Sequence, residues 1–223
     1  MEPLLRAYNV RTMKKGVAGA QTVRVGGIQV ATGSHAGKTI YISSDHRGFL
    51  LKRRLSAALR RRGWKVADRG PHRQVSTDYP LAAVRAARAV GRSGGRRGVG
   101  IGICGSSIGM MIAAAKISGV HPANPPNVAG ARTTRRHNNS NFLALAAERT
   151  PFKRALAIVL AWLAEPFYSN PAADRRYLRR YLETAGLDRQ RGARKPRFRD
   201  GSRFGSRARK RSFRNAVRLG QHR

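Results

Sequence analysis

Several side chains that could move a proton stand directly after predicted strands. Cys104 is the only cysteine and ends the apolar run GVGIGIC, and Ser106 follows it in a small polar turn. Asp45 and His46 come soon after the apolar run TIYIS. A thiol, an imidazole and a carboxylate are groups that serve in general acid–base catalysis. Sites in open parallel sheets form beyond the carboxyl ends of the strands, so we expect these residues to meet there.

A third polar segment, RRHNNSN at residues 135–141, lies next to another predicted strand. It carries His137 and Asn138, and we expect it to join the other two segments in one proton-transfer site. Each of the titratable residues also has a structural alternative. Cys104 could be a small apolar side chain packed between sheet and helix. His137 could be an ordinary helix histidine or an RNA contact, and Asp45 could cap a helix.

Strands and helices alternate from residue 39 onward and must position these groups. Short apolar or alternating runs predict strands at 39–43, 64–68, 98–104, 119–124 and 142–146. Amphipathic spacing and end signals predict helices at 48–63, 79–91, 107–116, 131–139, 152–167 and 172–186. This alternation predicts an α/β protein with a three-layer Rossmann-like fold. Its sheet would have five parallel strands, with helices on both faces.

The chain divides into three parts: a basic segment 1–38, one α/β domain 39–186, and a tail 187–223. The first part holds six Lys and Arg residues but one acid, which resembles a mitochondrial presequence in composition. We therefore expect a protein of the mitochondrial matrix, with the cytoplasm as the alternative location. An ordered extension is the alternative, because QTVRVGGIQVAT predicts a hairpin of two short strands. No run of residues is long and apolar enough to span a membrane.

Positive charge dominates the composition. The chain has 46 Lys and Arg residues against 10 Asp and Glu, a formal net charge of +36. The excess is not confined to the ends, because residues 39–186 alone hold 26 basic and 7 acidic residues. Such a chain repels itself unless a polyanion neutralises it. The composition therefore predicts a nucleic-acid partner, structured RNA above all.

The tail is rich in Arg, Gly and Ser with interspersed Phe, so it cannot bury a core of its own. Arginine contacts phosphates and stacks on bases, and phenylalanine adds stacking surfaces. We predict an RNA-binding tail. Its predicted RNA-binding residues are Arg194, Lys195, Arg197, Arg199, Arg203, Arg207, Arg209, Lys210, Arg211 and Arg214.

Four motifs occur in a characteristic order: SDHRGFLLK, TDYP, ICGSSIGMMIAAAK and RRHNNSNFLALA. Together they resemble the ribose-5-phosphate isomerase B family, which includes the galactose-6-phosphate isomerase subunits. The resemblance covers about residues 39–183. It implies an aldose–ketose isomerase whose cysteine base moves a proton between C1 and C2 of a sugar phosphate through an enediolate. The residues that match the family's catalytic positions are Cys104, Ser106 and His137.

The resemblance also implies a substrate site. The matching substrate-binding positions are Asp45, His46, Tyr79, Asn138, Arg175 and Arg179. Arg176 with Arg180 is an alternative pair for the phosphate, because both pairs lie four residues apart. Members of the family form dimers that share sites across the interface, so a homodimer is expected. We expect no cofactor and no metal.

The motifs also depart from the family pattern. Ser107 stands where the family has glycine, Ala115 replaces an asparagine, and Glu148 replaces an arginine. Because catalysis needs its supporting residues in place, these changes favour a scaffold that has lost its activity. Together with the charge, they favour a structural RNA-binding protein, most simply a mitochondrial ribosomal protein. Its partners would be ribosomal RNA and neighbouring ribosomal proteins. The alternative is an active isomerase that uses Cys104 as its base.

Overall fold

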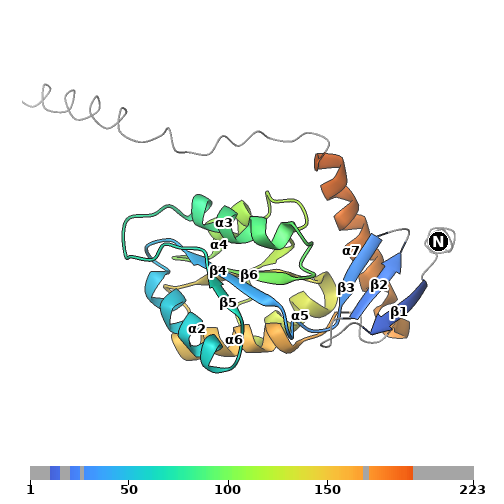
Figure 1. The fold of residues 1–223 in the computed structure, drawn as a ribbon, viewed down its shortest axis with the longest axis horizontal. Helices are drawn as coiled ribbons and strands as arrows, with labels where there is room; N and C mark the ends of the chain where they lie inside the picture. Colours follow the sequence, from blue (N-terminus) through green and yellow to red (C-terminus); the bar gives the residue numbers. More distant parts are fainter. Residues whose placement is uncertain (1–10, 16–20, 26–27, 168–170, 193–223) are drawn as a thin grey trace, which may run out of the picture. The chain divides into compact units, whose positions relative to one another are not determined.

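A five-stranded parallel sheet forms the centre of the structure, a computed structural model that describes residues 11–15, 21–25, 28–167 and 171–192. The strand order is β5-β4-β6-β8-β7 (Figure 1). The strands are β4 (Thr39–Ser44), β5 (Val66–Asp68), β6 (Gly98–Cys104), β7 (Pro122–Ala123) and β8 (Phe142–Ala146). The predicted sheet is confirmed, with β7 shorter than expected.

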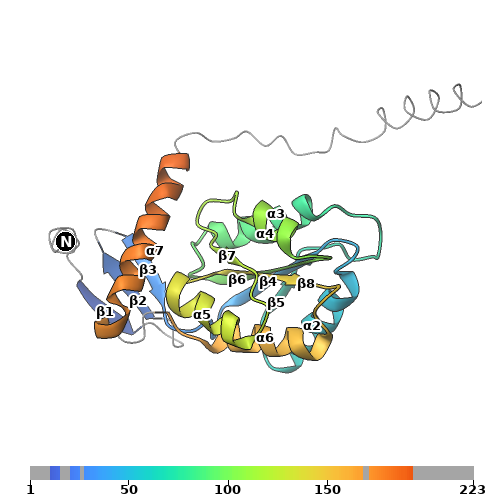
Figure 2. The same ribbon diagram turned by 180° about the vertical axis from the view of Figure 1, so that it is seen from behind.

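Helices cover both faces of this sheet, which confirms the three-layer Rossmann-like fold (Figure 2). One face carries α2 (Phe49–Arg61), α5 (Val128–Asn138) and α6 (Phe152–Ala164), packed over an apolar cluster that includes Leu55 and Trp162. The other face carries α3 (Tyr79–Gly91) and α4 (Ile108–Ala114) over a cluster with Met110 and Phe142. Two separate apolar layers therefore hold the sheet between them.

The glycine-spaced strand β6 lies at the middle of the sheet, and all seven of its residues are buried. A side chain at Gly100 would collide with the ring of Phe142, and one at Gly102 would collide with Met110. Glycine at these two positions therefore lets large side chains of the neighbouring strand and of α4 pack directly on the backbone of β6. This close packing fixes the position of Cys104 at the end of the strand.

A second sheet precedes the parallel one. Its antiparallel strands are β1 (Arg11–Lys15), β2 (Gln21–Val25) and β3 (Ile28–Thr32), and β2 with β3 are the two strands predicted for the hairpin. The long helix α7 (Pro171–Gly192) packs beside β3 through Leu178 and Leu182, which contact Val30 and Phe167. Residues just before the parallel sheet thus share a core with the last helix.

Residues 30–38 are integrated into this core, since Val30, Thr32, His35 and Lys38 are all buried. The mitochondrial location stays a prediction. The predicted RNA-binding residues between 194 and 214 lie outside the described part of the chain. Among the helices that the structure does describe, none has the length and apolar character needed to cross a membrane.

Candidate active site

Cys104 and its turn lie at the carboxyl edge of the sheet. The side chain of Cys104 is 3% exposed and packs in the apolar cluster below α3 and α4. Ser106 is half-buried, and Ser107, immediately before α4, has φ 71°, in the left-handed region. The Ser107 hydroxyl donates to the carbonyl of Ser106. A serine therefore occupies a backbone conformation that favours glycine, which is the family's residue in the resemblance.

Asp45 lies on the neighbouring turn, between β4 and α2. Its backbone N–H donates to the carbonyl of Ile103 at 3.0 Å, which ties this turn to the end of β6. Its Oδ1 accepts from the N–H of Gly48 at 2.8 Å. A side chain at Gly48 would collide with the carbonyl of Ile103, so this glycine permits the close approach. Asp45 thus orders the turn, and it lies beside the strand that carries Cys104.

His46 and Tyr79 extend the same edge toward solvent. His46 is exposed, and its Nδ1 donates to the carbonyl of Thr77 at 3.1 Å. This bond leaves Nε2 as the acceptor nitrogen of a neutral ring. Tyr79 opens α3 and is 42% exposed, and its ring lies against Gly109 of α4. The structure thus brings His46, Tyr79, Asp45 and the Cys104 turn to one edge.

An ion pair covers the outer side of the Cys104 turn. Arg47 pairs with Glu148, and both side chains lie so close to Gly105 that a side chain there would meet them. The backbone N–H of Glu148 also donates to the carbonyl of Gly105 at 3.2 Å. The sequence reading treated Glu148 only as a departure from the family pattern. Its partner Arg47, in the SDHRG motif, could not be identified from the sequence because the two residues are far apart along the chain.

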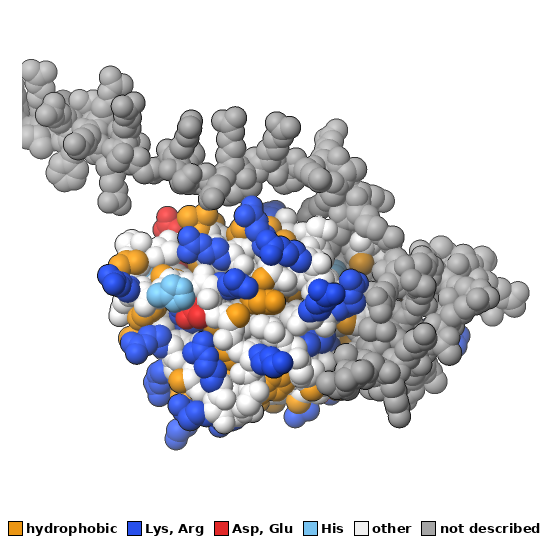
Figure 3. Space-filling model, viewed as in Figure 1, with side chains coloured by type: hydrophobic (Ala, Val, Ile, Leu, Met, Phe, Trp, Pro, Cys, Tyr) orange, Lys and Arg blue, Asp and Glu red, His pale blue; other side chains and the backbone are white. Residues whose placement is uncertain are grey.

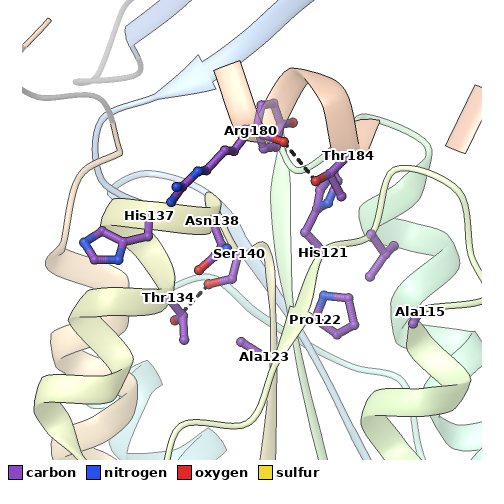
Figure 4. A pocket seen from close by; sticks show the side chains of 12 residues that line it. Ala115, His121, Pro122, Ala123, Thr134, His137, Asn138, Ser140, Arg180 and Thr184 are labelled. Carbon is purple, nitrogen blue, oxygen red and sulfur yellow. Dashed lines mark hydrogen bonds between the residues drawn. The ribbon is translucent and has the colours of Figure 1, made fainter. Parts of the chain in front are cut away.

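A separate cavity of about 380 Å³ opens at the amino edge of the sheet. His137, Asn138 and Arg180 help to line it, and Figure 4 shows Arg180 reaching from α7 toward the end of α5. The His137 ring stacks on Tyr177 with 4.1 Å between ring centroids. Burial lowers the pKa of His137, and the nearby guanidinium of Arg136 lowers it further, which favours the neutral ring.

The four arginines considered for the phosphate have different surroundings, and Arg176 donates to the Tyr177 hydroxyl at 2.8 Å. Arg180 lines the cavity with His137, whereas Arg175 is exposed and does not line it. Arg179 pairs with Glu183 of its own helix at 2.9 Å. Of the two alternative pairs for the phosphate, only Arg176 with Arg180 therefore has a member that lines this cavity.

Within one chain, the structure does not bring His137 and Asn138 to Cys104. Helix α5 runs antiparallel to the strands, so its last residues meet the start of β8, whereas Cys104 pairs with Ala146 at the end of β8. The length of this strand, on the order of 15 Å, separates the two groups. One chain therefore carries two half-sites, one at each edge of the sheet.

A buried network that the sequence reading missed supports the amino edge. Arg135, with no exposed surface, donates to the carbonyl of Gly33 at 3.0 Å and to the carbonyl of Ser140 at 2.8 Å. It also donates to Oδ1 of Asn139 at 2.7 Å, while the Asn139 amide donates to the carbonyl of Ala31 at 3.0 Å. The residues around His137 are thus bonded to the segment that precedes the parallel sheet.

Two more buried groups of that segment complete the network. His35 Nε2 donates to the carbonyl of Ser140 at 3.3 Å, and its Nδ1 accepts from Lys38 Nζ at 3.3 Å. Burial lowers the pKa of His35, and the charges of Arg135 and Lys38 lower it further. Burial, with the charge of Arg135, also lowers the pKa of Lys38 to about 7. Three basic side chains therefore lie together in this network, and in the bonds described neither His35 nor Lys38 has an acidic partner.

A parallel α/β sheet with helices on both faces and polar turns at the carboxyl ends of its strands defines a class of protein whose small-molecule sites form at that edge. Within that class the family is clear. The chain belongs to the ribose/galactose isomerase family, whose sequence model matches residues 40–178.

Individual relatives agree with this assignment. Ribose-5-phosphate isomerase B of Escherichia coli K12 is 38% identical over 130 residues, which cover 58% of this chain and 86% of the relative. The Clostridium thermocellum ribose-5-phosphate isomerase B structure is 37% identical with a TM-score of 0.62, and the match covers 68% of this chain and 98% of that one. The Mycoplasma genitalium enzyme, solved with bound ribulose-5-phosphate, is 30% identical with a TM-score of 0.64, over 69% and 97% of the two chains.

These findings overturn the favoured sequence hypothesis. The relatives are sugar isomerases, so the prediction of a ribosomal, RNA-binding protein with ribosomal RNA and ribosomal proteins as partners is wrong. The error came from net charge, which governs solubility and non-specific attraction but specifies neither a fold nor a site. The alternative, a sugar-phosphate isomerase, is the better supported one.

Proposed function

We propose that the chain is an aldose–ketose isomerase that interconverts ribose 5-phosphate and ribulose 5-phosphate. The observation that carries this proposal is the gathering of Cys104, Ser106, Asp45, His46 and Tyr79 at one edge of the sheet. They lie in a domain that is similar over most of its length to named ribose-5-phosphate isomerases.

The proposed chemistry needs one base and one stabilised oxyanion. The Cys104 thiolate takes the proton from C2 of the open-chain aldose, and the electron pair of the broken C–H bond forms the C1–C2 double bond of the enediolate. The negative charge passes to O1, where the Ser106 hydroxyl and the backbone of the turn can donate hydrogen bonds. Cys104 then returns its proton to C1, and O2 becomes the ketose carbonyl as its proton moves to O1.

The buried sulfur limits how substrate can reach the base. Cys104 is 3% exposed, so little of its surface is open to substrate. The reacting carbon must therefore reach the sulfur from the side of the turn that Gly105 and Ser106 form. A substrate lying there would also touch the exposed side chains of His46 and Tyr79.

The two half-sites support a shared site between two copies of the chain. One copy would supply the Cys104 turn, and the other would supply His137, Asn138 and Arg180 of the amino-edge cavity. Near the Cys104 turn, Ile108 and Ile112 of α4 are 49% and 51% exposed, an apolar surface that a second copy would cover. Arg180 would then bind the substrate phosphate, and the neutral His137 ring would move the proton needed for opening of the sugar ring.

Two measurements test this proposal separately. The purified wild-type chain should interconvert ribose 5-phosphate and ribulose 5-phosphate, and the absence of turnover would overturn the proposed activity. The Cys104→Ala and His137→Asn variants should each be inactive as homodimers. Co-expressed, they should recover up to about a quarter of the wild-type activity, because half of the dimers are mixed and each has one intact site. An active wild type whose two variants do not complement would overturn the shared site alone.

A further inference from the structure

A second hollow, of about 390 Å³, lies between the edge strand β5 and the helix α3, and none of its lining residues belongs to either half-site. We call it the α3 groove. The side chains that line it are Asp68, Arg69, His72, Arg85, Arg88, Ala89 and Arg92. Four guanidinium groups therefore surround one small space, and the groove shares no residue with the proposed active site.

The one acidic residue of the groove is already neutralised. Lys52 Nζ donates to both carboxylate oxygens of Asp68 at 2.8 Å, and the N–H of Gly70 donates to Oδ1 at 2.8 Å. Lys52 is fully buried, so this bond is part of the folded core rather than a surface contact. Asp68 is thus committed to Lys52 and does not offset the charge of the four arginines.

The arginines themselves carry no compensating acid. Arg85, Arg88 and Arg92 are spaced three and four residues apart, so they lie on one side of α3 over about 10 Å. Within the part of the chain that the structure describes, no ion pair involves Arg69 or any of these three arginines. In the view of Figure 3, basic side chains are common on the described surface and acidic ones are few. Like charges at this spacing repel one another, which lowers the stability of the helix. A bound anion would replace this repulsion with attraction.

Two of the arginines have their positions set by neighbouring groups. The Arg69 guanidinium lies over the ring of Tyr41, 5.0 Å from its centroid. A terminal nitrogen of Arg85 lies next to Gly70, 3.5 Å from the position that a Cβ atom would take at this glycine. Gly70 has φ 88°, a conformation that favours glycine, so the space in front of Arg85 stays open. Packing therefore orders part of the groove before any ligand arrives.

We infer that the α3 groove binds a small anion with two or more linked phosphate groups, such as a di- or triphosphate. The planar guanidinium fork matches phosphate oxygens in pairs, and a single phosphate would engage only part of a row that extends over about 10 Å. The volume suits a small molecule. Ala89 is the one apolar residue of the lining, so the phosphate chain, rather than a base or sugar attached to it, is the part recognised.

Calorimetric titration of the full chain with inorganic tripolyphosphate tests the inference. The Arg85→Gln, Arg88→Gln double variant should bind roughly tenfold or more weakly, given the strength of hydrogen bonds to charged groups. The matched control is Lys153→Gln, Arg154→Gln, which removes the same charge from exposed positions of α6 on the other face of the sheet. It should bind within about twofold of wild type, because long-range charge is screened by salt.

Three further readouts locate and classify the ligand. Tripolyphosphate should slow amide hydrogen exchange in residues 68–92, and Arg180→Gln should not weaken its binding. Adenosine triphosphate without magnesium should bind like tripolyphosphate if the phosphate chain is recognised, whereas orthophosphate should bind at least about tenfold more weakly. Equal losses in the groove and control variants, equal affinity for orthophosphate, or protection elsewhere but not in residues 68–92 would each overturn the inference. These outcomes do not depend on isomerase activity.

Discussion

The two edges of the parallel sheet are built in different ways. At the carboxyl edge, the Cys104 turn is held by short backbone contacts, such as the bond from Asp45 to Ile103, and it ends in exposed apolar side chains. At the amino edge, His137 lies beside a buried network that centres on Arg135 and reaches back to Gly33. The first edge is ordered by backbone bonds with a half-exposed ion pair over the turn, and the second is fixed by buried side chains.

This difference separates two requirements of the proposed enzyme. A proton-transfer turn must admit substrate, so its order comes from the backbone and from small residues. In the proposed shared site, His137 of one copy acts beside Cys104 of the other copy. Its position must therefore be fixed within its own chain, and the network around Arg135 provides that support. The segment before residue 39, which precedes the family match, thus becomes part of the scaffold of the second half-site.

The largest effect is expected from the carboxyl edge. The Cys104→Ala variant should lose about a thousandfold in kcat for isomerisation, since a general base of this kind contributes on that scale. Its KM and its urea unfolding midpoint should change little, because alanine fits the small buried space. Steady-state kinetics and denaturation curves measure both, and a loss of less than about tenfold in kcat would argue against Cys104 as the base.

The network at the amino edge should dominate stability instead. Arg135→Met should lower the free energy of unfolding by about 3 kcal/mol, because it leaves several buried acceptors without donors. The control is Arg132→Met on the same helix, where a half-exposed arginine pairs with Glu165 at 3.0 Å. That change should cost less than about 1 kcal/mol, because Arg132 is half-exposed and Arg136 still pairs with Glu165 at 2.6 Å. Urea titration gives both values, and equal costs would show that the network contributes no special support.

The phosphate role proposed for the amino edge predicts a binding defect. Arg180→Gln should raise KM for ribose 5-phosphate roughly tenfold or more, since it removes a charge-assisted bond to the phosphate. Arg179→Gln is the neighbouring control, because Arg179 pairs with Glu183 and does not line the cavity. If Arg179→Gln had the larger effect on KM, the other arginine pair would be the phosphate site.

The buried basic groups of the network predict that the free energy of unfolding depends on pH. The folded-state pKa of Lys38 is about 7 against 10.5 in the unfolded chain, so between these values the unfolded state binds more protons. Stability should therefore rise with pH from about 7 to 10.5, and the lowered pKa of His35 adds a rise below pH 6.5 in the same direction. Lys38→Met should stabilise the protein most at pH 7 and below, and this gain should disappear toward pH 10.5.

Unfolding free energies measured across this pH range test the assignment, with Lys65→Met as the control at an exposed position. The difference between wild type and Lys38→Met isolates Lys38 from the other titrating groups. A difference that stays constant between pH 7 and 10.5 would mean that Lys38 is not desolvated in the folded state.

The smallest effect returns to the Cys104 turn. Ser107 has φ 71°, so Ser107→Gly should raise the free energy of unfolding by roughly 0.5 to 1 kcal/mol. Ser106 is not among the residues with positive φ, so Ser106→Gly should instead lower stability slightly. Thermal denaturation of both variants measures the difference. A loss of stability in Ser107→Gly would show that the serine hydroxyl contributes more than the strain costs.

Much of the carboxyl edge could be predicted from sequence because its signals are local. The apolar run of β6, the turn that follows it and the helix start at Tyr79 lie within short stretches whose residue types specify their conformation. The amino edge could not be predicted in the same way. Arg135 bonds to Gly33, 102 residues away, and no periodicity or spacing marks such a pair.

The sequence by itself determined the α/β alternation, the parallel sheet and the family, since hydrophobic periodicity and turn chemistry are properties of neighbouring residues. Its charge suggested the wrong partner, because net charge does not specify a site. Only the tertiary structure decided that His137 lies at the edge opposite Cys104, that Arg180 rather than Arg179 lines the cavity, and that four arginines surround one groove. These outcomes depend on the direction in which each helix packs and on which of its faces meets a neighbour, and both are set by contacts between distant parts of the chain.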